Sequence, residues 1–177
     1  MRIIAGKYRG RVLAEFRGQD IRPTSDRVKE SLFQILSGKL IGARVLDLFC
    51  GSGALGIEAL SRGASYVVFN DFSRESLAVC KKNLAAVKEE GELHALDFRA
   101  CLLSVSGKFN IIFSDPPYKQ DYTAEILRIV KERDLLAEGG LVVCESEREE
   151  TAPEGWELAD FRSYGRTKVA MFQRSNA

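Results

Sequence analysis

The alternation of apolar runs with amphipathic stretches is the feature that most limits how this chain can fold. From residue 43 onward, short apolar runs alternate with longer segments whose apolar residues recur at helical spacing. Val45–Leu46 and Ile111–Ile112–Phe113 are apolar on consecutive residues, which is typical of strands covered on both faces. The predicted strands are 43–49, 65–71, 92–97, 109–115 and 141–146, and the predicted helices are 54–63, 73–91 and 124–136. This order predicts a doubly wound α/β fold with a mostly parallel sheet.

The C-terminal residues 156–174 break the alternation. They read as two strand-like runs around the turn 164–167, with no helix between them. Strands joined directly by a tight turn are antiparallel, so we expect a hairpin at the edge of the sheet.

An extension precedes the alternating pattern. Residues 1–16 read as two short strands around a Gly-bounded turn, which predicts a β-hairpin, and residues 22–36 read as an amphipathic helix. We therefore divide the chain into an N-terminal extension, residues 1–40, and an α/β domain, residues 41–177.

Basic residues gather in this extension, although the net charge of the whole chain is only +1. The first eleven residues contain no acid, and their basic residues are Arg2, Lys7, Arg9 and Arg11. Few acids accompany the basic residues that follow, which are Arg17, Arg22, Arg27 and Lys29. Such a surface suits phosphate contact, but charge alone fits a solvated face equally well.

Composition excludes several classes of protein. No apolar stretch is long enough to span a membrane, and the N-terminus lacks the apolar core of a signal peptide, so we expect a cytoplasmic protein. Cys50, Cys80, Cys101 and Cys144 are scattered without a CxxC pair, and His94 is the only histidine. These residues argue against a metal site and for reduced, structural thiols.

A glycine-rich loop follows the first predicted strand. The stretch DLFCGSGALG places Gly51, Gly53 and Gly56 in a GxGxxG array between a strand and a helix. Glycines there permit a tight turn and let backbone N–H groups approach a ligand at a helix N-terminus. Asp71 closes the next strand, at the separation expected of an acid that binds ribose hydroxyls. The loop therefore predicts a nucleotide-containing cofactor.

Acids near this loop favour one cofactor over another. Asp47 lies just upstream of the glycines, where a carboxylate opposes a pyrophosphate but suits the ammonium and sulfonium of S-adenosylmethionine. Asp97 ends the third strand and Phe98 follows it, so the pair can bind and pack an adenine. Asp97 can equally serve as the cap of a following helical turn.

The stretch SDPPY, residues 114–118, ends the fourth predicted strand. This fold places that strand end beside the end of the first strand, at the topological switch point where ligands bind. The Asp115 carboxylate and the Pro116 carbonyl can accept hydrogen bonds from an exocyclic amine, while Tyr118 offers a stacking face for a flipped-out base. Pro117 restricts the backbone that carries the Pro116 carbonyl. An ordinary strand-ending turn is the alternative.

These motifs together resemble a known family. DLFCGSGALGIEALSRGA with SDPPY is similar to class I S-adenosylmethionine-dependent methyltransferases that act on planar amines. The opening MRIIAGKYRGRVL, then RPTSDRVKESLFQIL, and the closing YGRTKVAMFQR resemble the RsmD family, over nearly the whole chain. The resemblance implies a seven-stranded methyltransferase sheet and methylation of the 2-amino group of one guanine in bacterial 16S rRNA. It also implies S-adenosylmethionine as donor and, as partner, that rRNA in the small ribosomal subunit or an assembly intermediate.

The resemblance also assigns residues to sites. The cofactor would contact Asp47, Phe49, Gly51, Ser52, Gly53, Leu55, Asp71, Phe72, Asp97 and Phe98. The acceptor and catalytic site would consist of Asp115, Pro116, Pro117 and Tyr118. The candidates for RNA contact from the resemblance are Arg9, Arg11, Arg22, Thr24 and Arg27, and the charge distribution adds Arg2 and Lys7. We expect a monomer without a metal.

The chain departs from the family pattern at a few positions. Asp71 stands where the family usually has Glu, and Ser73 where it often has Asp. Ser114 occupies a position that is more often apolar. None of these changes removes a reacting group, although a shorter acid at position 71 can weaken the contact with the ribose.

Other readings remain open. A similar Pro-Pro loop serves methyltransferases that act on adenine in DNA or on a protein glutamine. An NAD-dependent oxidoreductase would share the glycine array but leaves Asp47 and SDPPY unexplained. A non-catalytic RNA-binding module would bind RNA and be indifferent to the loss of Asp115.

Overall fold

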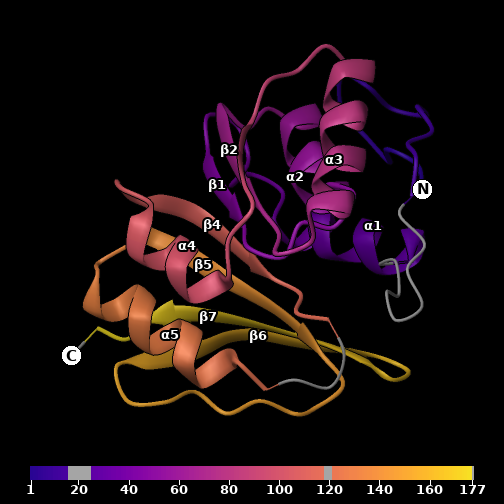
Figure 1. Ribbon diagram of the computed structural model, residues 1–177. Helices are drawn as coiled ribbons and strands as arrows, with labels where there is room; N and C mark the ends of the chain where they lie inside the picture. Colours follow the sequence, from indigo (N-terminus) through magenta and orange to yellow (C-terminus); the bar gives the residue numbers. More distant parts are fainter. Residues whose placement is uncertain (16–24, 118–120, 177) are drawn as a thin grey trace.

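A computed structural model of the chain describes residues 1–15, 25–117 and 121–176. Its strands are β1 Arg44–Asp47, β2 Tyr66–Asn70, β3 Glu92–His94, β4 Phe109–Ser114, β5 Leu136–Ser146, β6 Trp156–Tyr164 and β7 Thr167–Arg174. They form one seven-stranded sheet in the order β3-β2-β1-β4-β5-β7-β6 (Figure 1). The strands from β3 to β5 pair in parallel, whereas β7 pairs antiparallel with both β5 and β6. The predicted doubly wound sheet with a C-terminal antiparallel hairpin is confirmed.

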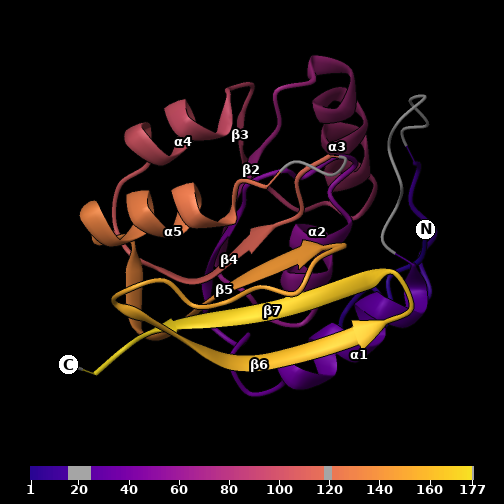
Figure 2. The ribbon, with the colours of Figure 1, turned by 90° about the horizontal axis from the view of Figure 1, so that it is seen from below.

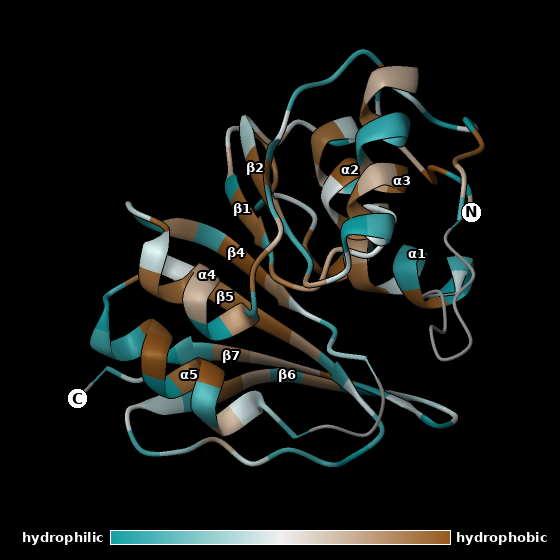
Figure 3. Cartoon of the chain, in the orientation of Figure 1, coloured by the Kyte–Doolittle hydropathy of each residue, from teal (hydrophilic) through white to brown (hydrophobic). Residues whose placement is uncertain are grey.

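Helices cover both faces of the sheet, and the consecutive apolar residues of the strands explain why. The helices are α1 Asp26–Ile35, α2 Ala54–Ser61, α3 Arg74–Ala86, α4 Phe98–Ser104 and α5 Thr123–Glu132. Helices α1, α2 and α3 lie on one face, and α4 and α5 lie on the other (Figure 2). In β1, Val45 belongs to the core on the first face and Leu46 to the core on the second, and both are fully buried. In Figure 3 the central strands are mostly hydrophobic, whereas the helices carry both hydrophobic and hydrophilic residues.

The structure differs from the predicted elements in the segment that leads to β5. Helix α5 ends at Glu132, earlier than expected. Asp134 has a positive φ of 53°, which is incompatible with a right-handed α-helix, so the helix cannot extend through this residue. Strand β5 then starts at Leu136 instead of 141, since Leu136 already pairs with Phe109 before a register shift. Residues Phe98–Ser104 form helix α4, where the sequence analysis expected no more than a helical turn.

The N-terminal hairpin is smaller than predicted. Residues 1–15 contain one antiparallel bridge, between Arg2 and Val12, in place of two paired strands. The chain instead folds over the C-terminal end of α2, where Lys7 N–H donates to the Ser61 carbonyl at 2.8 Å. Gly6 permits this approach, because its φ is +89° and a Cβ there would lie 1.9 Å from the Ser61 oxygen.

The extension shares its core with the rest of the chain. Ile3, Leu13 and Phe33 are buried in the same cluster as Val45 and Phe113. The rings of Phe33 and Phe113 lie 5.6 Å apart. The boundary between residues 1–40 and 41–177 therefore remains a prediction about function, while packing joins the two parts.

Candidate functional site

The pairing of β1 with β4 brings the two main sequence motifs together. Asp47 pairs with Phe113, and the Leu48 N–H donates to the Phe113 carbonyl at 3.1 Å. The glycine loop, residues 48–53, therefore leaves β1 beside the point where Asp115 leaves β4. From β1 the strand order continues to β2 and β3 on one side, and from β4 it continues to β5, β7 and β6 on the other. The two loops therefore flank a topological switch point, as the sequence predicts.

The glycine loop is shaped by two residues in left-handed conformations. Gly51 has a φ of 54° and Gly53 a φ of 93°. Gly53 is also the N-cap of α2 and offers no side-chain cap, which leaves N–H groups of the first turn for other partners. Among the described residues other than its two chain neighbours, none has an atom within 4 Å of the position that a Cβ on Gly51 would take. Ser52 is half-buried, whereas Leu55 is buried.

Asp47 lies beneath this loop. Its side chain is buried, with 1% exposure, and its carboxylate accepts the Gly56 N–H at 3.0 Å. Burial raises the pKa of Asp47 to about 7, against a smaller lowering by the Gly56 N–H, and the negative charge of Asp71 adds to the rise. The site around Asp47 therefore favours a cation.

Asp71 braces the glycine loop from the end of β2. One carboxylate oxygen accepts the Gly51 N–H at 2.8 Å, and the other accepts the Ser73 N–H at 2.8 Å. A carboxylate has about four lone-pair sites, so this half-buried group keeps acceptor capacity for hydroxyls. Asp71 therefore fixes the position of the glycine loop relative to the end of β2.

The predicted adenine residues differ in their surroundings. Phe72 is 79% exposed, whereas Phe98 is 4% exposed. Asp97 is the N-cap of α4 and accepts the Arg99 N–H at 2.9 Å, so the capping role is present. The Asp97 side chain remains half-exposed, which leaves it accessible to a base amine.

An aromatic cluster links the residue after the glycine-loop strand to helices α4 and α5. The Tyr122 ring lies 4.6 Å from that of Phe98 and stacks on Phe49 at 6.5 Å. The Arg99 guanidinium covers Phe98 at 4.4 Å and binds Glu125 through two hydrogen bonds. Sequence reasoning missed Tyr122, since nothing local links it to residues 49 and 98.

The SDPPY motif, residues 114–118, which the sequence predicts to be the acceptor site, begins at the last residue of β4. Ser114 is buried within the strand, Asp115 and Pro116 are half-buried, and Pro117 is exposed. The motif thus passes from core to surface within four residues. Tyr118 lies outside the described residues.

The predicted RNA residues lie on or near the N-terminal segment, residues 1–15. Arg2, Lys7, Arg9, Arg11 and Arg27 are exposed. The side chains of Lys7 and Arg11 also make contacts within the protein: Lys7 pairs with Glu89 at 3.5 Å, and Arg11 donates to the Ala86 carbonyl at the end of α3. Arg22 and Thr24 lie outside the described residues.

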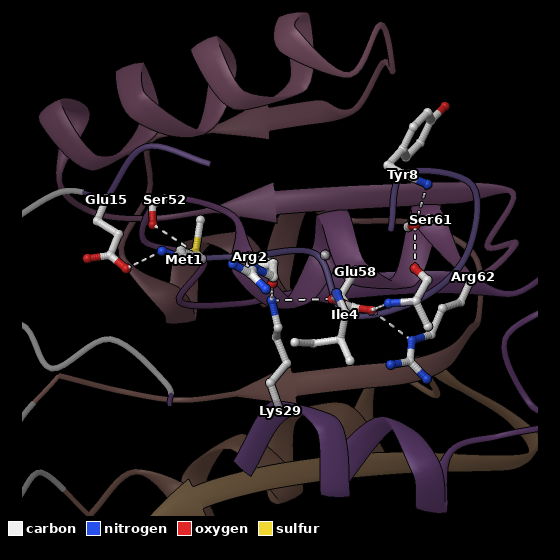
Figure 4. Close-up of polar contacts among 12 residues, drawn as sticks. Met1, Arg2, Ile4, Tyr8, Glu15, Lys29, Ser52, Glu58, Ser61 and Arg62 are labelled. Atoms are coloured by element: carbon white, nitrogen blue, oxygen red, sulfur yellow. Dashed lines mark hydrogen bonds and ion pairs between the residues drawn. The ribbon is translucent and has the colours of Figure 1, made fainter. Parts of the chain in front are cut away.

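A buried acid anchors the N-terminal segment to α2, and sequence reasoning missed it. Glu58 is fully buried and accepts the N–H groups of Ile4 and Ala5 at 2.9 and 3.1 Å (Figure 4). It also pairs with Lys29 at 3.3 Å and Arg62 at 2.8 Å. Lys29 is 1% exposed, so this lysine does not belong to the basic surface. A single acid in the apolar helix ALGIEALS was the available signal.

Two structural findings bear on other classes of protein. Within the described ranges, no three metal-ligating side chains gather at one place. None of the helices in those ranges combines the length and apolarity needed to cross a bilayer.

The charge around the glycine loop bears on which class of nucleotide cofactor the loop could hold. Two acids, Asp47 and Asp71, border the loop, and the negative charge of Asp71 is one of the causes that raise the pKa of Asp47. The Asp71 carboxylate and the partly ionised Asp47 would repel a pyrophosphate, whereas they would attract an ammonium or sulfonium.

Comparison with known proteins gives a consistent result. The profile of a family described as "Conserved hypothetical protein 95" matches residues 1–173. Ribosomal RNA small subunit methyltransferase D of Escherichia coli K12 is 36% identical, over 98% of this chain and 90% of that protein. The enzyme of that name from Haemophilus influenzae is 34% identical, over 98% of this chain and 93% of its own.

Solved structures agree with the sequence matches. The structure of Escherichia coli yhhF, provisionally named a methyltransferase, superimposes with a TM-score of 0.89 at 34% identity. The match covers 100% of this chain and 99% of that one. The fold is therefore that of a class I methyltransferase, and the chain belongs to the Conserved hypothetical protein 95 family, the RsmD family.

Proposed function

We propose that this protein is an S-adenosylmethionine-dependent methyltransferase that modifies the 2-amino group of a guanine in bacterial 16S rRNA. The observation that carries the proposal is the pairing of β1 with β4, which sets the glycine loop and Asp115 at one switch point. The names of relatives at 34–36% identity support rRNA as the substrate class. The choice of guanine N2 rests on the family resemblance and the acceptor motif.

The cofactor would lie across the glycine loop and supply an electrophilic methyl group. The Gly51 backbone and the N-terminus of α2 would hold its methionine end, and Asp47 beneath the loop would balance its positive charge. Asp71 would accept from the ribose hydroxyls, with Phe72 and Asp97 at the base.

The acceptor motif would orient the nucleophilic amine. An exocyclic amine of a purine is a weak nucleophile, because its lone pair is delocalised into the ring. The Asp115 carboxylate and the Pro116 carbonyl would each accept one N–H bond, which fixes the nitrogen in line for attack. Tyr118 would stack on the target base after the base has flipped out of the RNA helix. Methyl transfer leaves the nitrogen with a positive charge, and the proton that it then releases would pass to the Asp115 carboxylate or to water, so the step would need no histidine base.

The exposed arginines and lysine of the N-terminal segment would contact RNA phosphates. The partner would be 16S rRNA in the small ribosomal subunit or an assembly intermediate, met in the cytoplasm by a monomer. Adenine in DNA and a protein glutamine remain the competing substrates of the same chemistry.

The substrate is tested by labelled methyl transfer. Undermodified small subunits, naked 16S rRNA and duplex DNA are offered in parallel, and the product nucleoside is identified by mass. We expect guanine methylated on its 2-amino group. Methyladenine in DNA would keep the chemistry and overturn the substrate, and no transfer to any of the three would overturn the proposal.

Asp115→Ala tests the role of the acceptor carboxylate. We expect S-adenosylhomocysteine to bind as in the wild type, measured by calorimetry, while the rate of transfer falls about 100-fold because the amine is no longer held in place. Asp121→Ala is the matched control, since this exposed acid follows the motif and pairs with Arg148. Full activity of Asp115→Ala would exclude the mechanism.

A further inference from the structure

The N-terminal segment contacts the glycine loop as well as the end of α2. The Ser52 hydroxyl lies 3.8 Å from the Met1 sulfur (Figure 4). Ser52 lies between Gly51 and Gly53, the two residues that set the path of the loop. A surface proposed for RNA is therefore in contact with a loop proposed for the cofactor.

The buried side chain of Asn83 links the N-terminal segment to the glycine loop by direct hydrogen bonds. Asn83, on the inner face of α3, is 2% exposed. Its Nδ2 donates to the Ala14 carbonyl and to the Ser52 carbonyl, both at 2.9 Å, and its Oδ1 accepts the Ala14 N–H at 2.9 Å. All three bonds go to backbone groups, so they depend on where the two segments run and not on their side chains.

The side chain of Asn83 is suited to this task by its hydrogen-bonding groups. Two carbonyls need two donors, and one N–H needs an acceptor, which a carboxamide supplies in a single planar group. An aspartate would keep the acceptor and lose both donors, and an alanine would lose all three. A displacement of Ala14 must either carry Asn83 with it or break these bonds, and either event changes what holds the Ser52 carbonyl.

We propose that Asn83 is a positioning residue that couples RNA contact at the N-terminal segment to cofactor affinity at the glycine loop. The inference rests on the proposed function, because it needs RNA on one side and S-adenosylmethionine on the other. Coupling between two sites is reciprocal, so RNA raises the affinity for the cofactor by the factor by which the cofactor raises the affinity for RNA. The enzyme thereby binds the cofactor tightly mainly when the RNA substrate is bound.

The test measures the dissociation constant of S-adenosylhomocysteine, which permits no turnover, with and without saturating 16S rRNA. In the wild type we expect RNA to tighten binding about fivefold or more, the lower end of typical couplings. In Asn83→Ala and Asn83→Asp we expect the ratio to fall close to one, while each ligand alone still binds. Retention of the wild-type ratio in both variants would overturn the proposal.

Asn110→Ala is the matched control. The side-chain oxygen of Asn110 accepts the Arg44 N–H at 2.8 Å. This hydrogen bond lies at the start of β1, away from the end of that strand where the glycine loop begins, so Asn110→Ala removes a side-chain hydrogen bond far from both sites. We expect Asn110→Ala to lower the melting temperature and leave the coupling ratio unchanged. A drop in the ratio there as large as in Asn83→Ala would mean that general loosening explains the effect, which also overturns the proposal.

A wild-type measurement guards against variants that fail to fold. Hydrogen exchange of the amides of residues 50–56 should slow on addition of 16S rRNA without cofactor, because a steadier segment holds the loop through Asn83. If RNA is bound and methylated but neither exchange nor affinity responds, the coupling fails while the proposed function stands. If the wild type neither binds nor methylates RNA, both fail.

Discussion

At the scale of single residues, Asp47 is the group whose titration the structure defines best. Its pKa is raised from the usual 3.8 to about 7, mainly by burial. Because the folded state holds the proton more tightly than the unfolded chain, this group destabilises the fold progressively as pH rises from about 4 to about 7. The shift corresponds to on the order of 4 kcal/mol at most.

Asp47→Asn should therefore stabilise the ligand-free protein above pH 7 and change little near pH 4, measured by urea unfolding at both values. The amide oxygen can still accept the Gly56 N–H, so the loop should keep its shape. The control is Asp134→Asn, because Lys108 lowers the pKa of that acid and its removal should have the opposite sign. A stability difference that does not vary with pH would contradict the assignment.

The same group gives a signature in cofactor binding. A cation bound near Asp47 favours the ionised carboxylate, so binding of S-adenosylhomocysteine at pH 6 should release a proton. Calorimetry in buffers of different ionisation enthalpy measures this release, and Asp47→Asn should abolish it. Equal proton release by the variant would place the cation elsewhere.

The residues that sequence reasoning found and those that it missed differ in one physical respect. Asp47 and Asp115 were found because each follows an apolar strand, and a strand end is a local pattern. Asn83 and Glu58 were missed because their partners are distant in sequence: Ala14 is 69 residues from Asn83, and Ile4 is 54 residues from Glu58. Only the packed chain shows what such a buried polar group contacts.

At the scale of elements, α2 holds the N-terminal segment through Glu58. Glu58→Gln should weaken both ion pairs and leave Lys29 buried without its counter-charge, so we expect a loss of about 3–5 kcal/mol in the free energy of unfolding. Glu132→Gln removes an exposed i,i+4 partner of Arg128 and should cost below about 0.5 kcal/mol. Equal losses in the two variants, measured by urea unfolding, would show that the buried pair contributes no more than a surface one.

Most elements were predictable because their signal is local. Helix α1 was predicted from its apolar face, and in the structure the Ser25 hydroxyl caps it by accepting the Val28 N–H at 3.2 Å. The start of β5 was not predictable, because Leu136 belongs to the sheet only through its pairing with Phe109. The N-terminal hairpin was overestimated for a similar reason, since its backbone bonds go partly to Ser61 of α2.

At the scale of the whole molecule, the N-terminal segment and α5 lie on opposite faces of the sheet (Figure 2). Substitutions on the two faces can therefore be compared to locate the surface that binds RNA. Arg9 is an exposed residue of the segment, and Arg128 is an exposed residue of α5. If Arg9 contacts one phosphate, Arg9→Gln should reduce the slope of log affinity against log salt by about 1, because one fewer counterion is released. Arg128→Gln should leave the slope unchanged. Binding of 16S rRNA at several salt concentrations measures both, and an unchanged slope for Arg9→Gln with a reduced slope for Arg128→Gln would move the RNA surface to the face of α4 and α5.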